Sequence, residues 1–247
     1  MQLFRAAFVN ELFKMMKRKK FISAGIISLI MIALGQLMVV LIKNFSGINL
    51  AGASAFPMLV LSIFSYTVIP LFGIFVAADL FSGEFSSNTM KLILSRPVSR
   101  FKIFLAKVAA AGSFVMLHLI FVMIASLIST IVVSGINISF FKIIIAYLVS
   151  FFPIFVFILF AILLSNILKG PTSVFMLSIL GFLVLFALGI VFSSYSSFFI
   201  IPLFDWFTFF TGNVMNVSKI LRVFVIMLSM GGLLFSTGYF LFEKRSV

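Results

Sequence analysis

Six long apolar stretches constrain the fold of this chain more than any other feature of its sequence. The first, residues 21–42, holds no charged side chain. A helix rises about 1.5 Å per residue, so it would be roughly 33 Å long, enough to cross a hydrocarbon core of about 30 Å. Inside a bilayer the backbone must satisfy its own hydrogen bonds, which predicts a helix for each stretch. We expect membrane spans at residues 21–42, 57–78, 108–134, 143–168, 172–193 and 220–242.

The composition excludes a soluble fold and most kinds of enzyme. Hydrophobic residues make up 64% of the chain and charged residues 9%, too few to cover the surface of a globule in water. There is no cysteine, and one histidine with five carboxylates leaves little for catalysis or metal binding. We therefore expect no catalytic residue, no metal and no cofactor bound by this chain. The fold class predicted is an all-α integral membrane protein with a bundle of six helices in one domain.

The basic residues predict the orientation of the bundle. The net charge of +13 gathers beside the apolar stretches, which is typical of membrane topology and not of a nucleic-acid partner. If the N-terminus is inside, four basic residues lie outside and 14 of the 18 lie inside. This asymmetry predicts a multi-pass protein of the cell membrane with both termini in the cytoplasm. The four outside are Lys43, Lys142, Lys219 and Arg222.

Residues 1–20 have the pattern of an amphipathic helix lying on the membrane. At helical spacing an apolar face gathers, and Glu11 and Lys14 fall on the opposite, polar face. Such a helix would contact membrane lipid at the level of the headgroups. A disordered basic tail that only sets the orientation is the alternative. The apolar face includes Phe4, Phe8, Leu12 and Met15.

Residues 194–219, before the last span, are apolar but too interrupted to cross the membrane. Pro202 and Asp205 argue against a full span, and Trp206 suits the membrane interface. We expect a re-entrant or interfacial hairpin on the outer side. Asp205 would be solvated there, or would gate or bind a cation.

His118, inside the third span, would form a hydrogen bond between helices or act as a proton relay.

Residues 79–107, here called the polar segment, form the long polar interval of the chain. Asp79 is expected to end the second span, and Ser82–Gly83 and residues 86–88 are turn material. Residues 89–95 can form a short helix parallel to the membrane, which Pro97 ends. Ser99 can then cap the helix that leads into the third span. A short amphipathic helix in this place is suited to docking on a soluble partner.

The polar segment resembles the first cytoplasmic loop of the permease subunits of type-2 ABC exporters. That loop has an acidic residue, then Gly-Thr, a leucine-rich run, a proline and a basic residue. This chain has Glu84, Asn88–Thr89, residues 92–94, Pro97 and Arg100 in that order. Asn88 departs from the usual glycine, although asparagine tolerates the left-handed conformation of a tight turn. The N-terminal amphipathic helix, the six spans with a hairpin before the last, and the closing residues 242–245 resemble the same family.

The resemblance implies a transport subunit without its own motor. The chain lacks a phosphate-binding Gly-x-x-x-x-Gly-Lys-Ser/Thr loop, so ATP and Mg would be bound by a separate cytoplasmic ATPase. Two ATPase copies and a second permease chain, identical or different, would complete the transporter. Glu84 would help fix the docked helix, or would only interact with a helix dipole, whereas Lys102 and Lys107 would mainly enforce topology. The residues implied in coupling are Glu84, Asn88, Thr89, Met90, Lys91, Ile93, Leu94, Arg96, Pro97 and Arg100.

The expected function is that of a bacterial exporter permease for an amphipathic or lipophilic substrate. Nearly uncharged spans favour such a substrate over a small ion, and antimicrobial or cytolytic peptides and drugs are candidates. Two alternatives stay open. The chain could be a secondary transporter or channel that needs no motor, or a membrane sensor or immunity protein that moves no substrate.

Overall fold

The computed structural model describes residues 2–46, 55–87, 89–90, 98–135, 139–192, 198–212 and 216–245, and within these ranges it is helical without strands. Six helices in the described part are long and apolar enough to cross a membrane. The prediction of an all-α membrane bundle with six spans is therefore confirmed. The spans are Lys19–Phe45, Phe56–Ser86, Arg100–Val133, Phe140–Ile167, Pro171–Val191 and Val217–Lys244.

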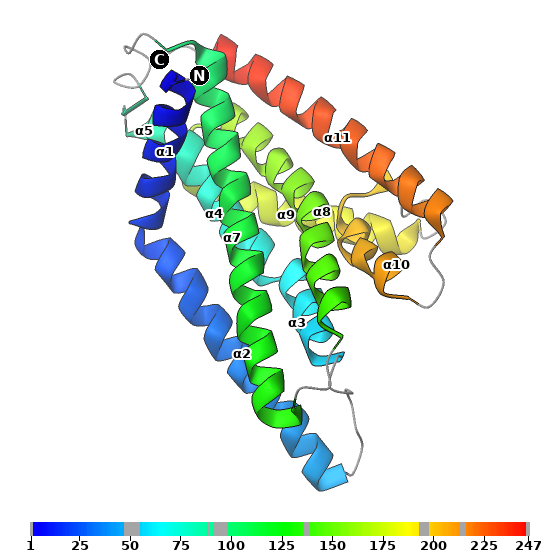
Figure 1. Ribbon diagram of the computed structural model, residues 1–247. Helices are drawn as coiled ribbons and strands as arrows, with labels where there is room; N and C mark the ends of the chain where they lie inside the picture. Colours follow the sequence, from blue (N-terminus) through cyan, green and yellow to red (C-terminus); the bar gives the residue numbers. More distant parts are fainter. Residues whose placement is uncertain are drawn as a thin grey trace.

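Helix α1 (Gln2–Met16) stands alongside the first part of α7 (Arg100–Ser134), and α2 (Lys19–Ser46) follows after a short break (Figure 1). Part of the expected apolar face packs against the bundle. Met15 is buried, Phe8 and Leu12 lie against the core, and Phe4 stacks on Phe8. The apolar pattern of α1 is therefore used, at least in part, against the protein. Contact of α1 with lipid stays a prediction.

The second span is built from four helical pieces. They are α3 (Ala55–Tyr66), α4 (Val68–Ala78), a π-helical turn η1 (Asp79–Gly83) and α5 (Glu84–Ser86). Thr67, with φ −122° and ψ −83°, interrupts the helix between α3 and α4. The helix does not turn at Ser82–Gly83 as expected but continues to Ser86, and the place where the span leaves the membrane stays a prediction. The helix continues because Phe81 and its neighbours are buried, with Phe81 packed on Phe104 and Phe242.

Three helices contain nearly all of the residues of the fourth to sixth predicted spans, whose limits in the membrane stay a prediction. Helix α8 (Phe140–Ile167) contains Pro153, and α9 (Pro171–Val191) begins at the proline of the expected break at residues 169–171. Helix α11 (Val217–Lys244) is the last span. Ser99 precedes α7 as expected, but its side chain makes no capping hydrogen bond.

Between α9 and α11 the structure describes residues 198–212, here called the hairpin segment. It consists of a 3₁₀ helix, η3 (Ile201–Phe207), and α10 (Thr208–Thr211), and it packs on α8. Trp206 is 4% exposed and lies against Phe210 and Phe224, and its expected place at the membrane interface stays a prediction. Gly189 on α9 approaches Pro202 so closely that a Cβ at this position would collide with the ring. The hairpin segment is thus a packed part of the bundle.

The two termini lie close together at one end of the bundle, beside the first turns of α7 (Figure 1). This arrangement follows from an even number of spans. We call it the charged end, because the ion pairs described below lie there. Its placement in the cytoplasm stays a prediction.

Candidate functional site

At the charged end, four side chains from three elements form a cluster that we call the buried ion cluster. It consists of Glu11 and Lys14 of α1, Glu84 of α5, and Lys107 of α7. The Lys107 ammonium donates to a Glu84 oxygen at 2.5 Å, and the Lys14 ammonium pairs with the other oxygen of Glu84. A Glu11 oxygen lies 3.3 Å from the Lys107 nitrogen. One carboxylate thus joins α1, the polar segment and the third span.

Because most of this cluster is buried, breaking one of its ion pairs is expected to lower the stability of the fold. Lys107 is 0% exposed, Glu84 2% and Glu11 4%, whereas the side chain of Lys14, at the edge of the cluster, is 35% exposed. Taking charges out of water costs several kcal/mol per ion, and attraction to a close partner offsets this cost only while the partner is present. Removing one partner from a buried pair costs about 3–5 kcal/mol for this reason. The three elements are therefore strongly held together at Glu84.

Two positions in this cluster differ from the expectation. Glu11 was placed on the polar face of α1, but it is buried because the Lys107 ammonium lies beside it. Lys107 was expected mainly to enforce topology, and it is instead the partner of Glu84. Its sequence carries a signal for this role, because it is a single lysine with apolar residues on both sides in 103–106 and 108–111. Lys102, by contrast, is exposed.

A second group of charges, the surface ion cluster, lies nearby. Asp79 pairs with Arg18 at 2.8 Å and with Lys20 at 3.0 Å. The side chains of Arg18 and Lys20 are 33% and 46% exposed, so water screens these pairs. The surface ion cluster joins the end of the second span to the break between α1 and α2. The same two pieces of chain are thus linked by both clusters.

The residues implied in coupling are placed as follows. Glu84 lies in the buried ion cluster, and Thr89 donates a hydrogen bond to the Glu84 carbonyl oxygen at 3.3 Å. Met90 is fully buried in the hydrophobic core, so it anchors the segment in this structure, and its contact with an ATPase stays a prediction. Arg100 donates to the carbonyl oxygen of Glu243 at 2.6 Å. Asn88, Lys91, Ile93, Leu94, Arg96 and Pro97 lie outside the described residues.

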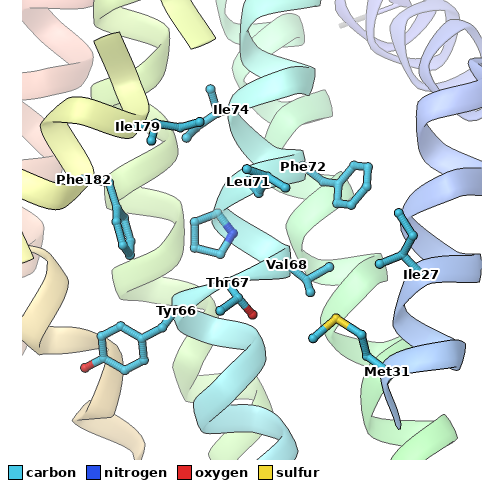
Figure 2. A pocket seen from close by; sticks show the side chains of 11 residues that line it. Ile27, Met31, Tyr66, Thr67, Val68, Leu71, Phe72, Ile74, Ile179 and Phe182 are labelled. Carbon is cyan, nitrogen blue, oxygen red and sulfur yellow. The ribbon is translucent and has the colours of Figure 1, made fainter. Parts of the chain in front are cut away.

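The interruption at Thr67 borders an apolar cavity of about 410 Å³ between α2, α4 and α9 (Figure 2). Leu71 and Phe72 of α4 lie between Ile27 and Met31 on one side and Ile179 and Phe182 on the other. Two polar side chains, Tyr66 and Thr67, are among those that line the cavity. Cavities of about 300–1,000 Å³ with apolar walls and few polar groups are typical of small-molecule sites.

Tyr66 also connects this cavity to the hairpin segment. Its hydroxyl donates to an oxygen of Asp205 at 2.8 Å, and Ser62 donates to the other oxygen at 3.4 Å. Asp205 is thus a hydrogen-bond acceptor for α3, a role that neither of the expected alternatives named. No pattern in the sequence indicates that residues 62–66 and 205 would meet.

His118 of α7 lies 3.0 Å from the Ser28 hydroxyl of α2, and Ser28 itself donates to Ala24. The predicted hydrogen bond between helices is confirmed. No cluster of three or more histidine, cysteine, aspartate or glutamate side chains that could hold a metal ion occurs among the described residues.

Six spans, a polar segment joined to the bundle by a buried ion cluster, and a mid-span cavity define the class as a multi-pass membrane protein. A family model described as ABC-2 family transporter protein matches residues 7–189. The chain therefore belongs to the ABC-2 family of transporter proteins, whose members are the membrane permease components of ABC transporters and associate with an ABC ATPase. A comparison with curated proteins gave no significant match.

Proposed function

We propose that this chain is the permease subunit of an ABC exporter and that the polar segment receives the movement of a separate cytoplasmic ATPase. The observation that carries the proposal is the position of Glu84. The residue stands at the base of the polar segment, and its carboxylate pairs with α1 and with the third span. A push on the segment would reach two other elements through contacts that are costly to break. Two ATPase copies and two permease chains would form the working complex, with ATP and Mg bound by the ATPase.

The mid-span cavity supports an amphipathic or lipophilic substrate. Its walls are almost entirely apolar, and Tyr66 and Thr67 supply hydroxyl groups at one part of the lining. A peptide or drug with an apolar body and a hydrogen-bonding group fits this chemistry better than a small ion does. Replacing Leu71 by tryptophan would fill the cavity. We expect the variant to lose transport while still assembling with the ATPase.

The experiment begins with an affinity-tagged chain purified from its native cells. We expect an ATPase to copurify and its hydrolysis rate to rise in the presence of the permease. Inverted vesicles holding the complex should take up an amphipathic peptide or a lipophilic dye when ATP is added. Native mass spectrometry gives the number of each chain.

The results separate the alternatives. Uptake driven by an ion gradient without ATP would indicate a secondary transporter. Binding of an ATPase with no uptake of any probe would indicate a sensor or immunity protein. Orientation is tested independently by labelling single cysteines in intact cells, because the chain has no cysteine of its own.

A further inference from the structure

The residue that follows α11, Arg245, brings three distant parts of the chain together at the charged end. Its guanidinium donates to three backbone carbonyl oxygens at the end of α8. Nη1 reaches those of Ser165 at 2.8 Å and Asn166 at 3.2 Å, and Nη2 reaches that of Leu168 at 3.0 Å. The last carbonyl groups of a helix have no partner within the helix and carry its negative dipole end. Arg245 therefore caps α8 from a different span.

The same guanidinium lies over the ring of Phe85, with 4.0 Å between its carbon and the ring centroid. Phe85 directly follows Glu84 of the buried ion cluster. The Ser82 hydroxyl donates to the Leu168 carbonyl oxygen at 3.2 Å, so α8 and the beginning of the polar segment are also joined directly. Buried Phe242, one turn before Arg245, packs its ring against Phe85. Residues 82–85 of the polar segment thus lie against the end of α8 and the end of α11.

Residue 100 of the polar segment lies at the end of α11 as well. Arg100, the first residue of α7, donates from Nη1 to the carbonyl oxygen of Glu243 at 2.6 Å and lies 3.5 Å from that of Arg245. Phe85 and Arg100, which come before and after residues 88–97 in the sequence, thus both lie against residues 242–245. A rigid support under both ends of a loop is what would turn a force on the loop into movement of the helices.

We propose that Arg245 is a positioning residue for coupling: it fixes the base of the polar segment to the end of α8, so that movement of the segment also moves the fourth and sixth spans. This role rests on the proposed function. An arginine suits it because a planar fork can serve three carbonyl groups while its face covers an aromatic ring, whereas a lysine is a point charge. Burial lowers the pKa of the Arg245 guanidinium from its ordinary value, but an arginine stays protonated.

The test uses three variants in the full chain, Arg245→Gln, Arg245→Lys and Lys244→Gln. Lys244 is the matched control, because it is adjacent and exposed and its ammonium lies over Phe240 of its own helix. The first readout needs no ATPase. A nitroxide label on Ser86→Cys, an exposed position next to Phe85, reports the mobility of the segment's base by electron paramagnetic resonance in lipid nanodiscs. We expect faster motion in both Arg245 variants and no change in the Lys244 variant.

The second readout is the number of dye or peptide molecules taken up per ATP hydrolysed by the complex in inverted vesicles. We expect both Arg245 variants to lower this ratio by about fivefold or more, the lower end of typical coupling free energies. Phe85→Leu should lower it as well, and should lower it little further when Arg245 is already glutamine, because the two residues act through one contact.

Unchanged label mobility in the Arg245 variants would overturn the proposal. A more mobile label with an unchanged uptake ratio would mean that Arg245 only caps α8. This result would also overturn the proposal. A wild-type complex that neither hydrolyses ATP nor takes up a probe would disprove the proposed function instead. The mobility measurement would still decide whether Arg245 holds the segment.

Discussion

The buried and surface ion clusters hold the same two pieces of chain together, but they do so in different surroundings. In the buried cluster Glu84 is 2% exposed and its partner Lys107 is 0% exposed. In the surface cluster the Asp79 side chain is 14% exposed, and its two cationic partners are a third exposed or more. A pair in water contributes about 0–1 kcal/mol, whereas breaking a buried pair costs several times as much. The connection between α5 and α7 should therefore depend on Glu84 far more than the connection between η1 and residues 18–20 depends on Asp79.

The largest effect is expected from Glu84→Gln, which leaves Lys107 buried with Glu11 at 3.3 Å as its remaining anionic partner. We expect the free energy of unfolding to fall by about 3–5 kcal/mol, because an ammonium in the interior loses its close carboxylate. Unfolding in mixed micelles, followed by the fluorescence of the single tryptophan, measures the loss. Stimulation of the ATPase should fall in the same variant.

Two controls sharpen this result. Lys102→Gln removes an exposed positive charge from the same helix and should leave stability unchanged. The double variant Glu84→Gln with Lys107→Gln should lose less than the sum of the single variants, because the two residues interact. If the losses of stability in the single variants add up to the loss in the double variant, Glu84 and Lys107 do not interact energetically. The buried pair would then not be stronger than the pairs of Asp79.

An intermediate loss of stability is expected when the hydrogen bond between the Asp205 carboxylate and a neutral hydroxyl group is removed. Tyr66→Phe removes the hydrogen bond of 2.8 Å to Asp205, leaving Ser62 at 3.4 Å. Hydrogen bonds to charged groups contribute about 1.5–3 kcal/mol, so the loss of stability should lie between those of the Glu84 and Asp79 variants. Ser62→Ala, at the longer distance, is the matched control and should have a smaller effect. An equal loss of stability in both variants would show that the Tyr66 hydrogen bond holds the hairpin segment no more strongly than the Ser62 hydrogen bond does.

The sequence predicted the spans well and the polar contacts poorly, and both outcomes have a physical reason. A span is a local property, since a run such as 143–168 is long and apolar whatever surrounds it. Burial of a charge depends on which segments meet. Lys107 and Glu11 look like ordinary membrane-surface charges until α1 is placed against α7. In the sequence, Asp79 likewise looks like the end of a helix. The helix continues past it because Phe81 packs on α7 and α11, which are distant in the sequence.

The smallest effect is expected from Asp79→Asn, and its dependence on salt makes it informative. We expect a loss of stability below about 1 kcal/mol at low ionic strength, because water already screens the pairs with Arg18 and Lys20. The screening length falls from about 30 Å at 0.01 M salt to about 3 Å at 1 M, so the difference from the wild type should vanish as salt is added. The loss in Glu84→Gln should persist, since its partner Lys107 is closed to solvent. A salt-dependent loss at Glu84, or a salt-independent one at Asp79, would mean that solvent exposure is not what distinguishes the two clusters.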